Sequence, residues 1–88
     1  MKQHHKIKIL PIYYEYVREG RKKFEVRKND RNYQNADIVT LQEWDQEYTG
    51  REATFEIGYV LKLGDFMGDK NDYVVFSLIE SYYMGDNV

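Results

Sequence analysis

The stretch Gly-Arg-Lys-Lys-Phe-Glu-Val-Arg, residues 20–27, sets a glycine suited to a turn directly before a short alternation of apolar and charged residues. Side chains of an extended chain point alternately to opposite faces. We therefore expect a strand whose apolar Phe24 and Val26 face a core. The charged side chains of this strand would share the other face: Lys23, Glu25 and Arg27. Such a face is either a binding site or a solvated surface whose ion pairs contribute about 0.2–1 kcal/mol each.

Positive charge is concentrated around this strand. The cationic residues of the region are Arg18, Arg21, Lys22, Lys23, Arg27, Lys28 and Arg31, and the acidic ones are Glu19, Glu25 and Asp30. The net charge of −2 hides this imbalance, because residues 1–36 carry ten positive and four negative side chains, while residues 37–88 carry three and eleven. A basic stripe can contact phosphates even on a protein of net negative charge. Alternatively, the basic and acidic parts neutralise each other within the fold.

Length and composition indicate a single domain over residues 1–88, near the size at which one hydrophobic core is only just sufficient. Cysteine is absent, which excludes disulfides and cysteine-based metal or nucleophilic sites. The first residues lack the apolar region of a signal peptide, and no segment reaches the ~20 apolar residues that span a bilayer. We expect a monomeric, soluble cytoplasmic protein that does not associate with membranes.

No cofactor is predicted, and the histidines do not indicate a metal site. His4 and His5 are adjacent, so on a strand they point to opposite faces and cannot chelate one ion together. The carboxylates also lack the spacing of a metal-binding loop. His5 has the same parity as Ile7 and Ile9, and we expect it to be a hydrogen-bonded residue at the rim of a barrel.

The remaining pattern predicts a mostly β protein with one or two short helices. Pro11 and Gly20 suit the start and the end of a helix over residues 11–19. Besides the basic strand, strands are expected over residues 5–10, 37–44, 51–63 and 72–81, with a bulge or bend at Gly58. Core candidates are Val74, Phe76 and Leu78 in the last strand, and Ala53, Phe55, Ile57, Tyr59 and Leu61 on one face of the strand before it. Five or six strands in this length indicate a small, mostly antiparallel α+β barrel.

Four residues of the opening stretch, Gly20, Lys22, Glu25 and Arg27, match the Gly-x-Lys-x-x-Glu-x-Arg signature of ASCH domains. These domains belong to the PUA-like superfamily of small β-barrels associated with RNA. Within that group the chain is most similar to the DUF3850 family of bacteria and phages. The pattern of that family is visible in residues 5–9, Pro11, residues 27–31, Tyr33, Asp37, residues 43–45, residues 48–52 and residues 73–75. The resemblance therefore covers nearly the whole chain.

The resemblance implies a PUA-like pseudo-β-barrel whose cleft lies beside the helix and binds RNA or a modified nucleoside. Lys22 and Arg27 would contact phosphate or a base carbonyl, and Glu25 would accept a hydrogen bond from a base or order the two cations. Further candidate contacts are Lys23, Lys28, Arg31 and Tyr33. The rings of Tyr33, Trp44, Tyr82 and Tyr83 either stack on unpaired bases or pack over the open ends of the barrel. The alternative for the signature residues is an ion-pair cluster that holds helix and strand together.

Two other functions fit the sequence. Some ASCH relatives hydrolyse the acetyl amide of N4-acetylcytidine with a Lys, a Thr and a Glu, and Lys22 and Glu25 could act here as acid and base on a water. The catalytic Thr of those relatives, however, falls at Glu25. The Ser and Thr residues that lie nearest to Lys22 in the sequence are Thr40, Thr49, Thr54 and Ser77. We therefore favour binding over catalysis. The third hypothesis is a protein-interaction module of a phage or mobile element, in which the acidic residues 37–88 meet a basic partner.

Overall fold

The computed structural model of the protein describes residues 2–68 and 71–80, which form one five-stranded sheet and two short helices. In chain order the elements are β1 (His4–Ile9), α1 (Pro11–Arg18), β2 (Phe24–Lys28), β3 (Ile38–Trp44), β4 (Tyr48–Lys62), α2 (Gly64–Met67) and β5 (Tyr73–Glu80). They follow the predicted elements closely, except that β4 begins within the expected hairpin and α2 occupies the expected loop before β5. Neither of the helices described has the length and apolar character needed to cross a membrane.

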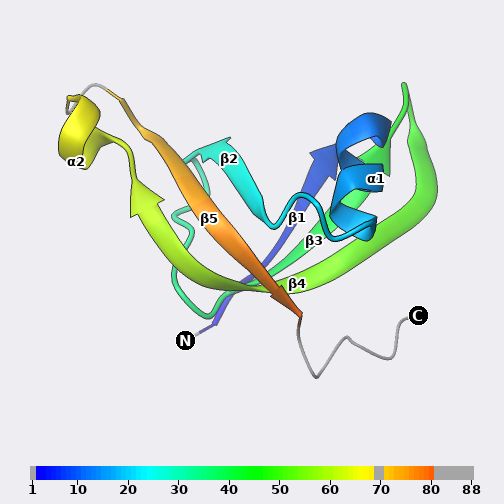
Figure 1. Ribbon diagram of the computed structural model, residues 1–88, viewed down its shortest axis with the longest axis horizontal. Helices are drawn as coiled ribbons and strands as arrows, with labels where there is room; N and C mark the ends of the chain where they lie inside the picture. The colour runs from blue at the N-terminus through cyan, green and yellow to red at the C-terminus, as the bar shows by residue number, and fades with distance from the viewer. Residues whose placement is uncertain (1, 69–70, 81–88) are drawn as a thin grey trace.

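The strands of the sheet follow the order β1-β3-β4-β5-β2. β1 runs parallel to β3, and the other three neighbouring pairs are antiparallel. The long β4 connects the two parts of the sheet, because it pairs with β3 through its first half and with β5 through its second half while it curves (Figure 1). The sheet therefore curls into a half-barrel with β1 and β2 as its edge strands, and the predicted small, mostly β α+β architecture is confirmed.

A bulge in β4 accompanies this curvature, at the position where the sequence predicts one. The register with β5 shifts between Ile57 and Val60. A Cβ atom at Gly58 would overlap the side chains of Ile79 and Ser77 on β5, so any larger residue there would force these side chains to shift. Beyond the bulge Val60 packs against the core, whereas Tyr59 and Leu61 are exposed. The expectation that Tyr59 and Leu61 share a face with Ile57 is therefore wrong, because the extra residue of a bulge reverses the alternation that follows it.

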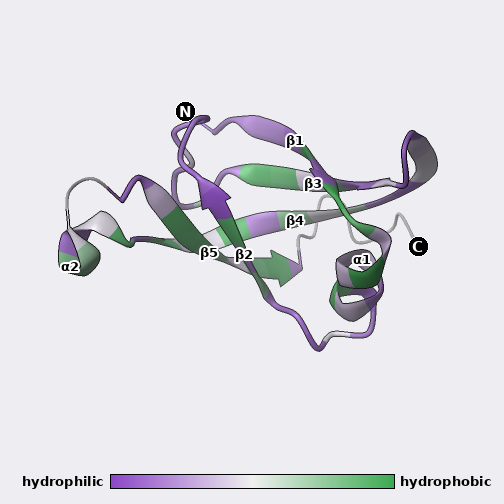
Figure 2. Cartoon of the chain, turned by 90° about the horizontal axis from the view of Figure 1, so that it is seen from above, coloured by the Kyte–Doolittle hydropathy of each residue, from purple (hydrophilic) through white to green (hydrophobic). Residues whose placement is uncertain are grey.

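The core lies on the concave face of the curled sheet, and α1 covers one end of it. Its most buried apolar side chains are Val39, Leu41, Ile57, Val74 and Phe76. The helix contributes Tyr14 and Val17 to the same cluster. Figure 2 shows hydrophobic segments in β3, β5 and α1, and a largely hydrophilic connection from α1 to β2. The predicted core face of the last strand, formed by Val74, Phe76 and Leu78, is confirmed.

Glu25 and Arg27 of β2 point to the core face, which corrects the expected orientation of this strand. Phe24 and Val26 are 46% and 49% exposed, whereas Glu25 is 4% exposed. The register gives the reason, because Glu25 is the partner of Phe76 in β5 and directly opposed residues of an antiparallel pair lie on the same face. Since Phe76 points into the core, Glu25 and Arg27 point to that side as well. Phe24 and Val26 consequently point away from the core.

A polar pair is buried where β1 and β3 begin. Asp37 Oδ2 accepts hydrogen bonds from His5 Nε2 at 2.8 Å and from the backbone N–H of Gln34 at 3.1 Å. Asp37 Oδ1 accepts a third from the backbone N–H of Gln3 at 3.0 Å. Burial alone would raise the pKa of Asp37, but the hydrogen bonds outweigh burial and lower that pKa below its usual value. His5 is therefore hydrogen-bonded, as expected, and it is also buried.

Arg51 of β4 links α1 to the sheet through hydrogen bonds. Its guanidinium donates to Glu43 through Nε at 3.0 Å and through Nη2 at 2.9 Å, and Nη2 also donates to Glu15 of α1. The guanidinium carbon lies 4.7 Å from the ring centroid of Tyr14. Hydrogen bonds from Arg51, and then from Thr49 Oγ1 at 2.7 Å, lower the pKa of Glu43 to about 2. Hydrogen bonds to Glu43 and then to Glu15 raise the pKa of Arg51, so this ion pair is charged at neutral pH.

Stability should decline in acid as Glu43 takes up a proton. Because folding lowers the pKa of Glu43, its stabilising contribution is complete above the ordinary value of 4.5 and is lost as the pH falls through about 2. Glu43→Gln should lower Tm at neutral pH and flatten the dependence of Tm on pH between about 5 and 2. Circular dichroism melts measure both, with Glu47→Gln in the exposed hairpin as the control. Parallel Tm profiles for the parent and Glu43→Gln would contradict this role.

Candidate functional site

The turn after α1 places Lys22 beside β2. Gly20 has φ of +77°, a left-handed conformation that glycine adopts without steric cost. The backbone N–H groups of Arg21 and Lys22 both donate to the carbonyl of Tyr16, at 3.0 and 3.1 Å. These bonds fold the chain back over the last turn of the helix. The predicted turn glycine thus has the conformation that leads the chain from α1 into β2.

Glu25 is the centre of a partly buried cluster of charges. Lys22 Nζ donates to Glu25 Oε2 and, at 2.7 Å, to the backbone carbonyl of Phe24. Arg27 Nε donates to Glu25 Oε1 at 3.1 Å, and Arg27 Nη2 donates to the carbonyl of Lys8 on β1. The side chain of Glu25 is 5% exposed, against 19% for Lys22 and 28% for Arg27. Each carboxylate oxygen is therefore engaged by a cation, while both cations still reach the surface.

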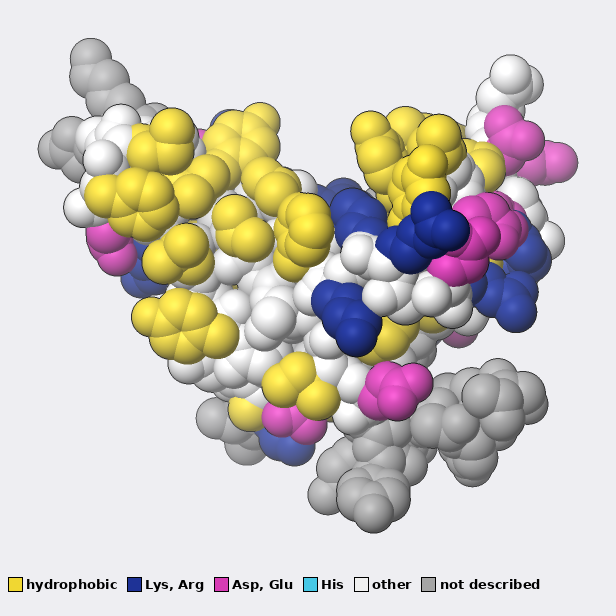
Figure 3. Space-filling model, viewed as in Figure 1, with side chains coloured by type: hydrophobic (Ala, Val, Ile, Leu, Met, Phe, Trp, Pro, Cys, Tyr) yellow, Lys and Arg dark blue, Asp and Glu magenta, His cyan; other side chains and the backbone are white. Residues whose placement is uncertain are grey.

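The signature side chains lie in a cleft of about 580 Å³ between β2 and α1, which we call the signature cleft. Its lining residues are Lys8, Ile9, Leu10, Tyr13, Lys22, Phe24, Glu25, Val26 and Arg27. Figure 3 shows a hollow between the hydrophobic side chains over α1 and those over β2 and β5, with Lys and Arg side chains at its base. The structure thus brings Lys22, Glu25 and Arg27 to one concave surface, with α1 along one wall.

The signature cleft combines an excess of positive charge with aromatic walls. Its charged side chains are Lys8, Lys22, Arg27 and Glu25. Lys22 Nζ lies 5.8 Å from the ring centroid of Tyr13 on α1 and 5.1 Å from that of Phe24 on β2. Donors beside ring faces suit a planar ligand that carries negative charge or carbonyl oxygens. Because both oxygens of Glu25 are engaged, its carboxylate orders the two cations of the cleft.

The other predicted contact residues lie outside the signature cleft. Lys28, Arg31 and Tyr33 line an adjoining groove together with Arg27. Lys23 is exposed and lines neither the cleft nor this groove. The cationic residues of the opening stretch are therefore divided, with Lys22 and Arg27 in the cleft and Lys23 on the outside.

Tyr33 packs inside the protein, which favours the packing alternative over the stacking of a base on its ring. Its exposure is 2%, and its ring centroid lies 4.7 Å from that of His5 and 4.8 Å from that of Phe76. Burial raises the pKa of the Tyr33 hydroxyl above its usual value of 10.0. Trp44 packs edge-on against Tyr48, with 4.8 Å between centroids. The remaining two stacking candidates, Tyr82 and Tyr83, lie outside the described residues.

Several side chains of the signature cleft were not predicted from the sequence. Lys8 contributes both its side chain and its carbonyl, and Tyr13 contributes an aromatic wall. The alternation of β1 does place Lys8 on the face opposite Ile7 and Ile9. Its approach to β2, however, depends on the curl of the sheet, for which the local sequence carries no signal. The exposed ring of Phe24 was missed because the strand orientation was inverted.

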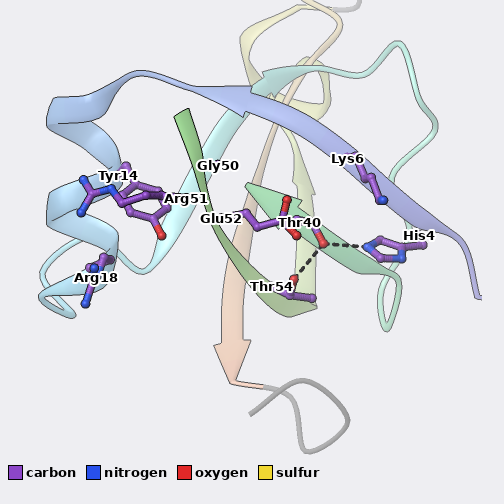
Figure 4. A pocket seen from close by; sticks show the side chains of 9 residues that line it. All are labelled: His4, Lys6, Tyr14, Arg18, Thr40, Gly50, Arg51, Glu52 and Thr54. Atoms are coloured by element: carbon purple, nitrogen blue, oxygen red, sulfur yellow. Dashed lines mark hydrogen bonds between the residues drawn. The ribbon is translucent and has the colours of Figure 1, made fainter. Parts of the chain in front are cut away.

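A second pocket, of about 510 Å³, has a largely polar lining (Figure 4). Tyr14 and Arg18 of α1 lie on one side of it. On the other side His4 Nε2 is 2.7 Å from Thr40 Oγ1, which is 2.8 Å from Thr54 Oγ1. The Thr40 hydroxyl is therefore shared between two neighbours, and the residue is 1% exposed. These bonds link the three adjacent strands β1, β3 and β4.

Among the described residues that line the signature cleft there is no Ser or Thr. Thr40 and Thr54 belong to the second pocket, Thr49 donates to a carboxylate of the sheet, and Ser77 accepts a backbone N–H in the bulge of β4. A Ser or Thr nucleophile therefore does not accompany Lys22 among the described residues of the cleft. Within residues 2–68 and 71–80, no three His, Asp or Glu side chains are grouped so that they could hold a metal ion.

Comparisons with known proteins place the chain in a family. The family model described as "Domain of unknown function (DUF3850)" matches residues 4–78. A relative from Escherichia phage P2, described as "Uncharacterized 12.9 kDa protein in GpA 3'region", is 40% identical over 76 residues. This similarity covers 85% of the present chain and 67% of the relative. All residues of the signature cleft lie within the range that the family model matches. The chain therefore belongs to the DUF3850 family.

Proposed function

We propose that this protein binds RNA or a modified nucleoside in the signature cleft, with the fold and the role of the ASCH domains of the PUA-like superfamily. One observation carries the proposal: Glu25 holds Lys22 and Arg27 at the base of a cleft flanked by the rings of Tyr13 and Phe24. The two cations offer charge-assisted hydrogen bonds to phosphate or to a base carbonyl. The rings offer faces on which an unpaired base can stack.

The balance of charge in the signature cleft favours a ligand over a purely structural ion-pair cluster. Glu25 is the only carboxylate among the described lining residues, and it faces Lys8, Lys22 and Arg27. A structural cluster gains nothing from additional cations, because like charges repel one another at close range. An anion bound in the cleft relieves this repulsion, and a nucleotide supplies both the anion and a planar base.

The two rival functions receive less support. Hydrolysis of N4-acetylcytidine would have to proceed without a Ser or Thr nucleophile, with Lys22 and Glu25 acting on a water, although these two side chains are bonded to each other. A protein-interaction module requires a partner for the acidic residues 37–88, and the geometry of the signature cleft does not supply one. Both rivals have a distinct outcome in the experiment below.

The affinity for single-stranded RNA should fall as salt is added, because phosphate contacts release counterions. Lys22→Ala and Arg27→Ala should each weaken binding and reduce the slope of log K against log salt by about 0.7. Fluorescence anisotropy of a labelled oligonucleotide at several salt concentrations measures affinity and slope together. Lys23→Ala is the matched control, because it removes the same charge from the neighbouring residue outside the cleft.

Glu25→Gln separates the positioning role of Glu25 from its charge. The substitution removes a negative charge, so long-range electrostatics alone would tighten the binding of RNA. If the carboxylate orders Lys22 and Arg27, binding becomes weaker instead. Identical affinities and slopes for the parent and the Lys22→Ala/Arg27→Ala double variant would overturn the proposal in favour of a protein partner. Release of acetate from N4-acetylcytidine would identify the hydrolase.

A further inference from the structure

A groove of about 390 Å³ adjoins the signature cleft. Lys8 and Arg27 line both spaces, and from them the groove continues to Lys6 on β1, to Arg31 in the loop after β2 and to Tyr48 at the start of β4. We call it the seam groove, because its lining comes from the two edge strands of the half-barrel and the segments beside them. Arg27, Lys28, Arg31 and Tyr33 of this lining were among the predicted contacts, whereas Lys6, Lys8 and Tyr48 were not.

A single guanidinium lies at the boundary between the two spaces. β1 and β2 are not neighbours in the sheet, and Arg27 spans them by donating to Glu25 on β2 and to the carbonyl of Lys8 on β1. The side chain of Arg27 is still 28% exposed. Because Arg27 lines both the signature cleft and the seam groove, a ligand that contacts it in one space can continue into the other.

The seam groove carries positive charge that the protein itself does not balance. Five cationic side chains line it, against the one carboxylate of Asp30. Arg27 is paired with Glu25, and the exposed Lys28 approaches Asp72 only to 3.9 Å. Of the other three groove cations, Lys8 lies over the ring of Trp44. Within residues 2–68 and 71–80, neither Lys6 nor Arg31 has an ion pair or a side-chain hydrogen bond. Such a row of unpaired cations favours a ligand with more than one negative charge.

An exposed aromatic ring stands beside these cations. Tyr48 is 53% exposed, and its ring is held edge-on against Trp44 at an interplanar angle of 81°. Lys8 Nζ lies 3.7 Å from the ring centroid of Trp44 and 5.8 Å from that of Tyr48. Proteins that bind single-stranded nucleic acid combine a positively charged groove with aromatic rings on which bases stack. The seam groove has both features.

We propose that the ligand of the signature cleft is part of an RNA single strand of at least two nucleotides, which passes over Arg27 and continues in the seam groove. Lys6, Lys8 and Arg31 contact the phosphates of this continuation, and Tyr48 stacks on its base. The proposal rests on the proposed function and narrows the substrate class to oligonucleotides. A free nucleoside held at Glu25 would leave the cations of the seam groove without a counterion.

The test compares short and long ligands of the same chemistry. Isothermal titration calorimetry measures the binding of each of the four nucleoside 5′-monophosphates, and of the RNA tetranucleotide made from the nucleotide that binds best. We expect the tetranucleotide to bind at least about tenfold more tightly, with a salt slope steeper by about 1.4 if two further phosphates are contacted. Lys6→Ala/Arg31→Ala should remove this advantage and leave the affinity for the monophosphate unchanged. Lys62→Ala, which removes a charge outside both spaces, should change neither affinity.

The possible outcomes separate this proposal from the proposed function. Equal affinities for the monophosphate and the tetranucleotide, or an equal loss of both in the double variant, would overturn the role of the seam groove and leave the signature cleft as a nucleotide site. Lack of binding by every ligand would overturn both. Lys6 and Arg31 are exposed, so an unchanged Tm of the double variant distinguishes loss of contacts from loss of fold.

Discussion

Phe76→Ala is expected to lower the free energy of unfolding by about 3–5 kcal/mol, a large part of the stability of a small domain. Phe76 has no exposed surface and lies at the centre of the concave face, where its ring packs 4.8 Å from that of Tyr33. Removal of the ring loses the free energy gained by burying it and leaves a cavity that the surrounding strands fill only in part. Thermal and urea denaturation followed by circular dichroism measure the loss, which should lower Tm by at least roughly 12 °C.

Phe24→Ala is the matched control for this substitution and tests the orientation of β2. Phe24 is the same residue type on the strand adjacent to β5, but it points away from the core and is 46% exposed. Its replacement should change the free energy of unfolding by no more than about 1 kcal/mol. A loss as large as that of Phe76→Ala would mean that Phe24 faces the core and that Glu25 does not. The position of the signature cleft would then be wrong as well.

Asp37→Ala should be nearly as damaging as the loss of a core ring, although Asp37 is a polar residue. Its carboxylate accepts hydrogen bonds from His5 Nε2 and from the backbone N–H groups of Gln3 and Gln34, and it is 1% exposed. A buried donor that is left without an acceptor costs about 1–3 kcal/mol, and the buried His5 loses its partner in this variant. Urea denaturation at neutral pH measures the loss.

Two further variants show whether the carboxylate of Asp37 is responsible. Asp37→Asn keeps the shape but places an amide where donors converge, so its stability should lie between those of the parent and Asp37→Ala. Asp45→Ala removes the same side chain from the exposed hairpin and should have little effect. The lowered pKa of Asp37 means that its contribution is present above the ordinary value of 3.8 and is lost in stronger acid. Equal stabilities of Asp37→Ala and Asp45→Ala would contradict this account.

The elements of the fold were predictable because each carries a local signal. Pro11 and Gly20 bracket α1, and the alternation of the last strand gives its core face as Val74, Phe76 and Leu78. Gly58 was recognised as a bend, but its effect on the residues that follow was not, because a bulge can be inserted on either side of a glycine. Tyr59 and Leu61 were therefore expected on the core face, although they are exposed.

The candidate site was predictable in its composition but not in its orientation. The signature pattern correctly singled out Lys22, Glu25 and Arg27 as residues that lie together. The inward orientation of Glu25 and Arg27 was not expected, since an alternating strand is normally interpreted with its apolar side inward. The contribution of Lys8 and Tyr13 to the cleft beside β2 could not be predicted, because both residues lie outside the signature in the sequence.

The sequence by itself determined the order of the elements, the turn at Gly20, and the grouping of charges that makes residues 20–27 unusual. Tertiary structure alone decided which face of β2 turns inward, because that choice follows from the register that pairs Glu25 with Phe76 across β5. It also decided that β1 and β2 approach each other through Arg27, since only the curl of a sheet with β4 at its centre brings these edges together. Local sequence specifies the periodicity of a strand, whereas the partner strand specifies which side of that periodicity is buried.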